Sequence, residues 1–468
     1  MKSDRKRIHC ILFLVSGVLV FTGCSNKQDK KSKQLKTEII AENTQNTDRE
    51  EDLYFDQKVT AEQICDINLN QVGYRPKDKK ITVVRDTLYT ELGRVAISPF
   101  GTVKYQKELM RSQARITEEE YDQRRKQYEC LAKQATCYGT NKKKDVSGGW
   151  YTKESVAWYV VPSITSLANI MYLEQYYKDE IESLSEEGNI DLDAMIRKEI
   201  KWLFKMQDQR SGGVYHKATT KTGNIPNDGN PIVVCEVSTA ATADFAAIMA
   251  KASMMYEYKD KKLAEDCLKA AEKAWSYLKD NEQNQEFTNP KDMVSWEYED
   301  SSDRDERFWA ATELYLATGE SEYAKAIREY DILQDDMEFD WSNVSAYACF
   351  DFYTKVNKKD SDFYLKIKTK LEGKVKEIQK GCEKGYYINP QYKGSSLHQL
   401  LNCAALLALM DKVSPNECYA SYVSRYLNYV MGTNSQSRNA FPDMIFEHRE
   451  QSLEVSSVLL LALQGMKR

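Results

Sequence analysis

The sequence lacks the features that usually mark a metalloprotein or a nucleic-acid-binding protein. It has four histidines in 468 residues and no Cys-x-x-Cys pair among its 11 cysteines, which leaves no zinc-binding constellation. The formal net charge is −5, whereas phosphate backbones are bound by basic surfaces. We therefore expect no metal, no cofactor and no nucleic-acid partner.

The N-terminal apolar run is too short for a stable membrane span. Lysines and arginines between positions 2 and 7 precede the apolar residues 8–21, which is the pattern of a secretory signal. The run ends in Gly23-Cys24, the cleavage pattern of bacterial lipoproteins. We expect an exported protein that is lipidated at Cys24 and held on the extracellular face of the cell membrane. An uncleaved anchor, or cleavage without lipid attachment, is the alternative.

Composition divides the rest of the chain into a tether, a β segment and a helical body. Residues 25–62 are polar and lack apolar periodicity, which is typical of a solvated tether. Residues 63–100 hold two short β-type runs, 67–76 and 80–84, too little for a full β-sandwich.

Beyond about residue 163, apolar residues recur at spacings of three and four, which predicts helices joined as antiparallel hairpins. The expected helices are 164–177, 191–207, 239–258, 261–279, 305–316, 345–353, 363–378, 396–410, 417–430 and 452–463. The pattern therefore predicts an all-α body over residues 101–468. Cys267, Cys349 and Cys403 fall within these apolar patterns, where buried free thiols are expected. A disulfide between Cys130 and Cys137 is left open.

Several segments, taken in order, carry a family resemblance. They are the runs at 70–74, 138–140 with 145–151, 205–217, 238–247, 305–319, 339–341 and 393–396. Together they resemble glycoside hydrolase family 9, the cellulase and endoglucanase family, over about residues 66–468. The resemblance implies an (α/α)6 barrel behind a partial immunoglobulin-like segment, and β-1,4-glucan or a related plant polysaccharide as the partner.

The position of the catalytic base departs from the family pattern. Inverting hydrolysis needs two carboxyl groups, one as acid and one as base, about 6.5–9.5 Å apart. The family supplies the base from an Asp-Ala-Gly-Asp run after Gly-Gly-Trp-Tyr, and here Thr152 and Ser155 stand where its aspartates would be. A hydroxyl does not usefully take a proton from water near neutral pH. Glu154, at the glycine position, is the alternative base, although its side chain should point elsewhere.

The general-acid position is better preserved. Glu450 precedes the apolar helix pattern of 455–463 in the register of the family's acid, with Arg449 in place of an asparagine. An adjacent guanidinium would lower the carboxyl pKa, which is unfavourable for a proton donor. An ion-paired structural glutamate is the alternative.

The resemblance also implies substrate-binding residues. His216 matches a family residue that hydrogen-bonds sugar hydroxyls, and four aromatic side chains are candidates for stacking on sugar rings: Trp150, Tyr215, Trp309 and Trp341. Core packing is the alternative for each. The sequence thus predicts a surface lipoprotein that acts on or binds β-1,4-glucan with impaired or absent hydrolysis. A non-catalytic glycan-binding or scaffold protein is the second hypothesis.

Overall fold

The computed structural model describes most of the chain from residue 126 onward. The described ranges are 126–151, 157–182, 191–223, 226–227, 229–330, 336–357, 359, 361–383, 396–433, 457–458 and 461–465, with strands at 67–69, 82–84 and 88–90.

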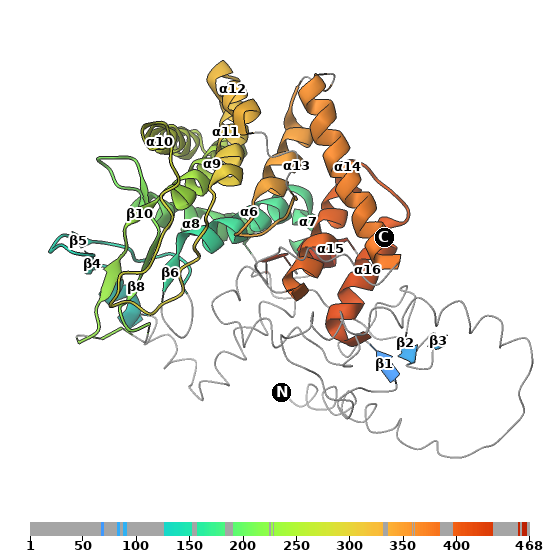
Figure 1. Ribbon diagram of the computed structural model, residues 1–468, viewed down its shortest axis with the longest axis horizontal. Coiled ribbons are helices and arrows are strands. Elements are labelled where there is room, and N and C mark those ends of the chain that lie inside the picture. Colours follow the sequence, from blue (N-terminus) through green and yellow to red (C-terminus); the bar gives the residue numbers. More distant parts are fainter. Residues whose placement is uncertain are drawn as a thin grey trace, which may run out of the picture.

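Two kinds of helix alternate along the chain. One kind is buried on most sides: α6 (Val160–Tyr176), α9 (Thr239–Tyr256), α11 (Arg304–Thr318), α13 (Ser345–Lys355) and α15 (Ser396–Val413). The other kind has one apolar face and one polar face: α8 (Leu192–Met206), α10 (Lys261–Asp280), α12 (Ser321–Tyr330), α14 (Asp362–Glu383) and α16 (Tyr419–Asn428). A helix that is apolar all round must be enclosed by others, whereas an amphipathic helix covers a core. The alternation therefore produces an inner and an outer layer of helices (Figure 1).

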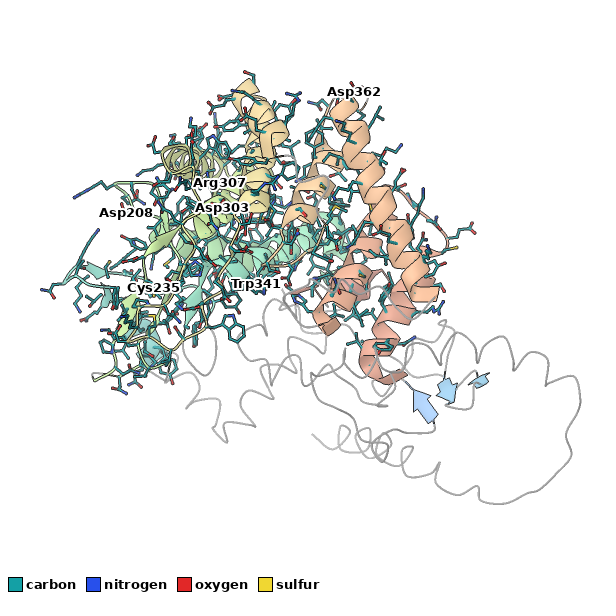
Figure 2. The ribbon with its side chains drawn as sticks, in the orientation of Figure 1. Asp208, Cys235, Asp303, Arg307, Trp341 and Asp362 are labelled. Carbon is teal, nitrogen blue, oxygen red and sulfur yellow. The ribbon has the colours of Figure 1, made fainter. Side chains whose placement is uncertain are left out.

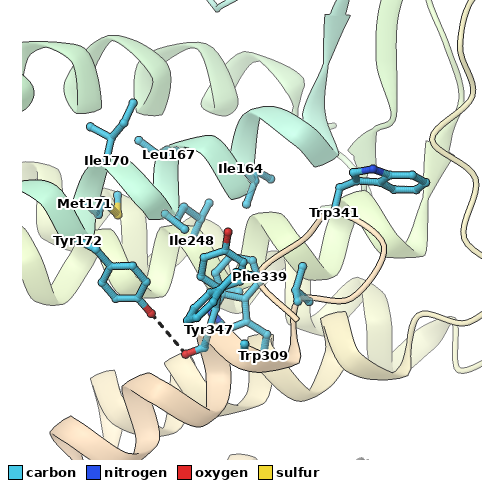
Figure 3. Packing of buried hydrophobic residues seen from close by; sticks show 14 of the residues in the cluster. Ile164, Leu167, Ile170, Met171, Tyr172, Ile248, Trp309, Phe339, Trp341 and Tyr347 are labelled. Atoms are coloured by element: carbon cyan, nitrogen blue, oxygen red, sulfur yellow. Dashed lines mark hydrogen bonds between the residues drawn. The ribbon is translucent and has the colours of Figure 1, made fainter. Parts of the chain in front are cut away.

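The inner helices pack through large aromatic side chains. The rings of Trp309 and Tyr347 are stacked with centroids 5.0 Å apart, and Phe339 meets Tyr347 edge to face at 4.7 Å. Tyr172 of α6 donates to the carbonyl oxygen of Tyr347 over 3.5 Å (Figure 3). These contacts join α6, α11 and α13 into one core.

One group of charged side chains inside the barrel is paired. Lys251 of α9 forms an ion pair with Asp351 of α13, which Lys355 also contacts at 3.1 Å. Buried charges are tolerated only when partners offset the loss of hydration. The group therefore ties α9 to α13 across the interior.

A small five-stranded sheet accompanies the helices, in the order β5-β4-β9-β8-β6. Its strands are β4 (Ala135–Cys137), β5 (Lys143–Lys144), β6 (Trp158–Tyr159), β8 (Lys217–Thr220) and β9 (Ile232–Val234), and only β4 and β9 run parallel. A second pair joins β7 (Val214–Tyr215) to β10 (Val237–Ser238). β6 runs directly into α6 and β10 into α9, so the sheets lie at the N-terminal ends of these inner helices (Figure 1).

A separate antiparallel sheet comes earlier in the chain. It consists of β1 (Ile67–Leu69), β2 (Thr82–Val84) and β3 (Leu88–Thr90) in that order. Two shorter helical pieces are α7 (Lys178–Glu182) and the π-helical η3 (Tyr429–Thr433), and β1 lies against η3.

The described cysteines are all free. Cys267, Cys349 and Cys403 are free and buried, as predicted. Cys130 and Cys137 are both free, so the disulfide left open by the sequence is not formed. Within the described part of the chain, no helix has the length and apolar character needed to cross a membrane.

Candidate functional site

Three aromatic residues from distant parts of the chain meet where inner helices begin. Tyr159 precedes α6, Tyr298 lies before α11 and Trp341 lies before α13. The Tyr298 ring is 4.9 Å from that of Tyr159 and 5.1 Å from that of Trp341, between centroids. Figure 3 shows Trp341 beside the start of α6, apart from the Trp309–Tyr347 pair. We call this end of the barrel, where the N-termini of the inner helices lie, the loop end.

The segment that would carry the base is anchored on both sides. Before it, the Trp150 backbone N–H donates to Glu199 Oε2 over 2.9 Å. After it, the Trp158 indole N–H reaches back to the Gly149 carbonyl oxygen over 3.3 Å, and the Tyr151 and Trp158 rings lie 5.2 Å apart. Thr152, Glu154 and Ser155 themselves lie outside the described residues. The residues on both sides of these positions are therefore held in place by hydrogen bonds.

Gly149 and Glu199 show why the residues flanking positions 152–155 cannot be freely replaced. A Cβ on Gly149 would lie 2.3 Å from the ring of Trp202, so only glycine fits there. Glu199 is fully buried, and burial raises the pKa of its carboxyl to about 8. Near neutral pH it is mostly a neutral acceptor for the Trp150 N–H.

His216 is a buried residue with both ring nitrogens engaged. Nδ1 lies 2.8 Å from Ser238 Oγ, and Nε2 lies 2.6 Å from the Glu297 carbonyl oxygen. A carbonyl only accepts, so Nε2 carries the proton and Nδ1 accepts from the serine hydroxyl. Burial lowers the His216 pKa to about 3, and the neutral ring stacks on Phe287 at 4.2 Å. Bonding a sugar hydroxyl would therefore require one of these bonds to break, and its substrate contact stays a prediction.

The four aromatic platforms predicted from the sequence lie in different settings. Trp309 is completely buried, and its indole N–H donates to Glu313 Oε1 over 3.0 Å, which favours the core alternative. Trp341 is 4% exposed and sits at the loop end. Trp150 and Tyr215 are half-buried, and the Tyr215 hydroxyl donates to Asp208 Oδ2 over 2.8 Å. Sugar stacking by any of them stays a prediction.

Glu450, Arg449 and Cys24 lie outside the described residues, so their predicted roles are not tested by the structure. Among the residues that are described, no group of three or more His, Cys, Asp or Glu side chains could hold a metal ion.

Several loop-end residues were not predicted from the sequence. They include Tyr159, Tyr298 and Trp296, which is half-exposed, and Lys217, which is fully buried. Lys217 Nζ donates to Asn289 Oδ1 over 2.7 Å and also to the Trp296 carbonyl oxygen. Two aromatic residues spaced two apart, Trp296 and Tyr298, come shortly before α11, as Phe339 and Trp341 come before α13. This repeated aromatic pattern could have indicated Trp296 and Tyr298 as loop-end residues from the sequence.

A group of acidic side chains lies at the start of α11. Burial and the neighbouring Asp300 raise the pKa of Asp305 to about 7, and burial raises the pKa of Glu306 well above its ordinary value. Asp305 Oδ2 accepts the backbone N–H of Val344 over 2.8 Å at the start of α13. Through this hydrogen bond Asp305 has a structural role, because it joins α11 to the start of α13 at the loop end. Figure 2 labels the neighbouring Asp303, directly before α11, and Arg307 on that helix.

Comparisons of the sequence with known proteins agree on one family. The sequence model described as glycosyl hydrolase family 9 matches residues 104–439. Endoglucanase D of Acetivibrio thermocellus is 27% identical over 322 residues, which is 64% of this chain and 51% of that protein. A xyloglucan-specific endo-beta-1,4-glucanase of Bacteroides ovatus is 28% identical over 321 residues, 62% of this chain and 54% of that one. The chain thus spans about half the length of these curated relatives.

Solved structures support the architecture. A family 9 glycoside hydrolase of Bacteroides ovatus superposes with a TM-score of 0.65 at 18% identity, covering 86% of this chain and 98% of that one. A thermostable endoglucanase of Alicyclobacillus acidocaldarius gives a TM-score of 0.59 at 23% identity, covering 71% and 78% respectively. At this identity the likeness concerns the fold alone. The predicted all-α (α/α)6 barrel is confirmed.

Proposed function

The chain belongs to glycosyl hydrolase family 9, and on that premise we propose that it binds β-1,4-glucan-type polysaccharide at the loop end while its hydrolysis is impaired or absent. The relatives carry names of enzymes that act on such polymers, an endoglucanase and a xyloglucan-specific endo-beta-1,4-glucanase. The half-buried Trp150 and Tyr215, together with the aromatic residues of the loop end, support a carbohydrate ligand because sugar rings pack on aromatic faces.

The replacement of both base aspartates carries the second half of the proposal. Thr152 and Ser155 offer hydroxyls where a carboxylate must take a proton from water. Losing general-base catalysis costs roughly 10²–10⁴-fold in rate. The anchors at Trp150 and Trp158 argue against a local rearrangement that would bring in another group, because both sides of the segment are held by hydrogen bonds, one part-buried and one buried.

A location on the cell surface completes the proposal. It rests on the basic and apolar N-terminal residues, on Cys24 after Gly23, and on the polar residues 25–62 that would hold the barrel away from the lipid. A lipid attached at Cys24 would be the protein's contact with the membrane.

The test measures binding and turnover on the same polymers. The chain from residue 25 onward keeps every described residue and is assayed on carboxymethyl cellulose, mixed-linkage glucan, xyloglucan and xylan. We expect retardation in polymer-containing native gels with little release of reducing ends. Restoring the base in the double variant Thr152→Asp, Ser155→Asp should raise the rate at least 10²-fold, the usual contribution of a general base.

Two outcomes would contradict the proposal. Clear wild-type turnover that Glu450→Gln abolishes would mean that the protein is a working hydrolase. Absence of both binding and turnover would instead favour the scaffold hypothesis.

A further inference from the structure

An exposed indole lies beside the loop end. Trp296 is 52% exposed, and Val294, two residues before it, is 73% exposed. The Trp296 ring centroid is 6.2 Å from that of Tyr298, which itself contacts Tyr159 and Trp341. Trp296 therefore continues the group of buried aromatic residues at the loop end (Tyr159, Tyr298 and Trp341) onto the surface.

The backbone that carries this indole is held by buried side chains. Lys217, fully buried in β8, donates its Nζ to the Trp296 carbonyl oxygen. His216, directly before it, donates Nε2–H to the Glu297 carbonyl oxygen over 2.6 Å. Two successive backbone carbonyls, those of Trp296 and Glu297, are thus held by buried side chains of neighbouring residues, the first by Lys217 and the second by His216.

Bonds on the other flank fix the same segment. The Val294 N–H donates to the Lys221 carbonyl oxygen over 3.0 Å. The side chain of Asn289 donates to the Ser295 carbonyl oxygen, while its own N–H donates to Glu297 Oε1 over 2.7 Å. The residues around Trp296 consequently have little freedom to lose when a ligand binds.

Tyr298 keeps the indole outside. Its φ of 52° lies in the left-handed region, which is unfavourable for a residue with a bulky side chain. Such a conformation persists only where the surroundings enforce it. In extended backbone the side chains of residues two apart share a face, but here Tyr298 is 1% exposed and Trp296 is 52% exposed.

We infer that Trp296 is a sugar-binding platform that stacks on a β-linked glucosyl or xylosyl ring next to the loop end, and that His216 and Lys217 position it. The face of such a ring presents C–H groups, which pack on an indole without leaving hydroxyls unhydrated. A platform that is already rigid gains affinity because little ordering is lost on binding. The inference rests on the proposed function and adds the residue that would hold an outer unit of the polymer.

The test compares single variants for binding to xyloglucan and mixed-linkage glucan oligosaccharides by calorimetry. Trp296→Ala should weaken binding roughly 10-fold, the worth of one aromatic contact. Trp296→Phe should recover most of the affinity because it keeps an aromatic face. The matched control is Tyr258→Ala, an exposed aromatic on the turn after α9, at the opposite end of that helix from the loop end, and it should bind like wild type.

The positioning role of His216 has its own measurement. His216→Ala should weaken binding, whereas adding it to Trp296→Ala should weaken binding no further, because the platform it holds is already absent. A merely structural effect would add to the loss. Melting temperatures of the variants are compared in parallel.

The two proposals fail in different ways. Wild-type binding that is unchanged in Trp296→Ala would overturn the platform and leave the proposed function standing. A wild-type protein that binds none of these oligosaccharides or their polymers would overturn both.

Discussion

At the scale of single residues, Glu199 is a buried acid that folding keeps protonated. Its pKa is raised from an ordinary value of 4.5 to about 8 by burial. Between these two values the folded protein binds a proton that the unfolded chain releases. The contribution of this group to the free energy of unfolding is therefore largest at low pH and falls as the pH rises from about 4.5 through about 8.

Glu199→Gln should remove that part of the pH dependence. One proton corresponds to about 1.4 kcal/mol per pH unit, so between pH 5.5 and 7.5 the wild type should lose roughly 2–3 kcal/mol more than the variant. Glutamine still accepts the Trp150 N–H. The measurement is urea unfolding at both pH values, with Glu286→Gln, an exposed glutamate, as the control that should leave the slope unchanged. An unaltered slope in Glu199→Gln would mean that the buried carboxyl is already ionised.

At the scale of elements, two glycines should respond oppositely to the same substitution. Gly149 faces Trp202, where an added Cβ would lie 2.3 Å from the ring, whereas Gly373 within α14 has open space around its Cβ position. Gly149→Ala should destabilise by about 1–3 kcal/mol through overpacking. Gly373→Ala should stabilise by about 0.5–1 kcal/mol through helix propensity. Thermal unfolding checks both.

The control is internal, because each variant adds one methyl group. Equal effects of the two substitutions would show that the Trp202 indole moves aside at little cost. In that case the residues around positions 152–155 would be less rigid than their hydrogen bonds suggest.

The elements that the sequence revealed are those with long apolar periodicity. The expected helices at 239–258 and 261–279 differ from α9 and α10 by only one or two residues at an end. α12 was missed, although Tyr323, Ala326 and Ile327 form its buried stripe. The five-stranded sheet was missed for a physical reason. β8 reads Lys-Ala-Thr-Thr and is buried at all four positions, so no alternation of apolar and polar residues marks it.

The candidate site was predictable only where a local motif defines it. The motif around His216 could be read from the sequence, but its partners Ser238 and Glu297 lie 22 and 81 residues away. Contacts at such separations exist only after the barrel has formed. The same holds for Trp296, whose carbonyl is bound by Lys217 at a separation of 79 residues.

At the scale of the whole molecule, α6 is joined to the C-terminal part of the chain. Asn169 in the middle of α6 donates Nδ2–H to Ser457 Oγ over 3.1 Å, although the two residues are 288 positions apart. The Asn169 Oδ1 accepts from the Tyr347 hydroxyl of α13 over 3.1 Å. One buried amide thus links α6, α13 and Ser457, and the barrel should unfold as a unit because its described inner helices share one core.

Asn169→Ala should therefore lower the stability of the whole barrel rather than of one helix. Removing both hydrogen bonds and leaving a small cavity should lower the free energy of unfolding by about 2–4 kcal/mol. Ser457→Ala, which removes one of the bonds, should cost about 1 kcal/mol. Far-ultraviolet circular dichroism and tryptophan fluorescence should follow the same urea transition in both variants, because secondary structure and core packing are lost together. Two separated transitions in Asn169→Ala would show instead that α6 and the C-terminal part of the barrel are stable apart.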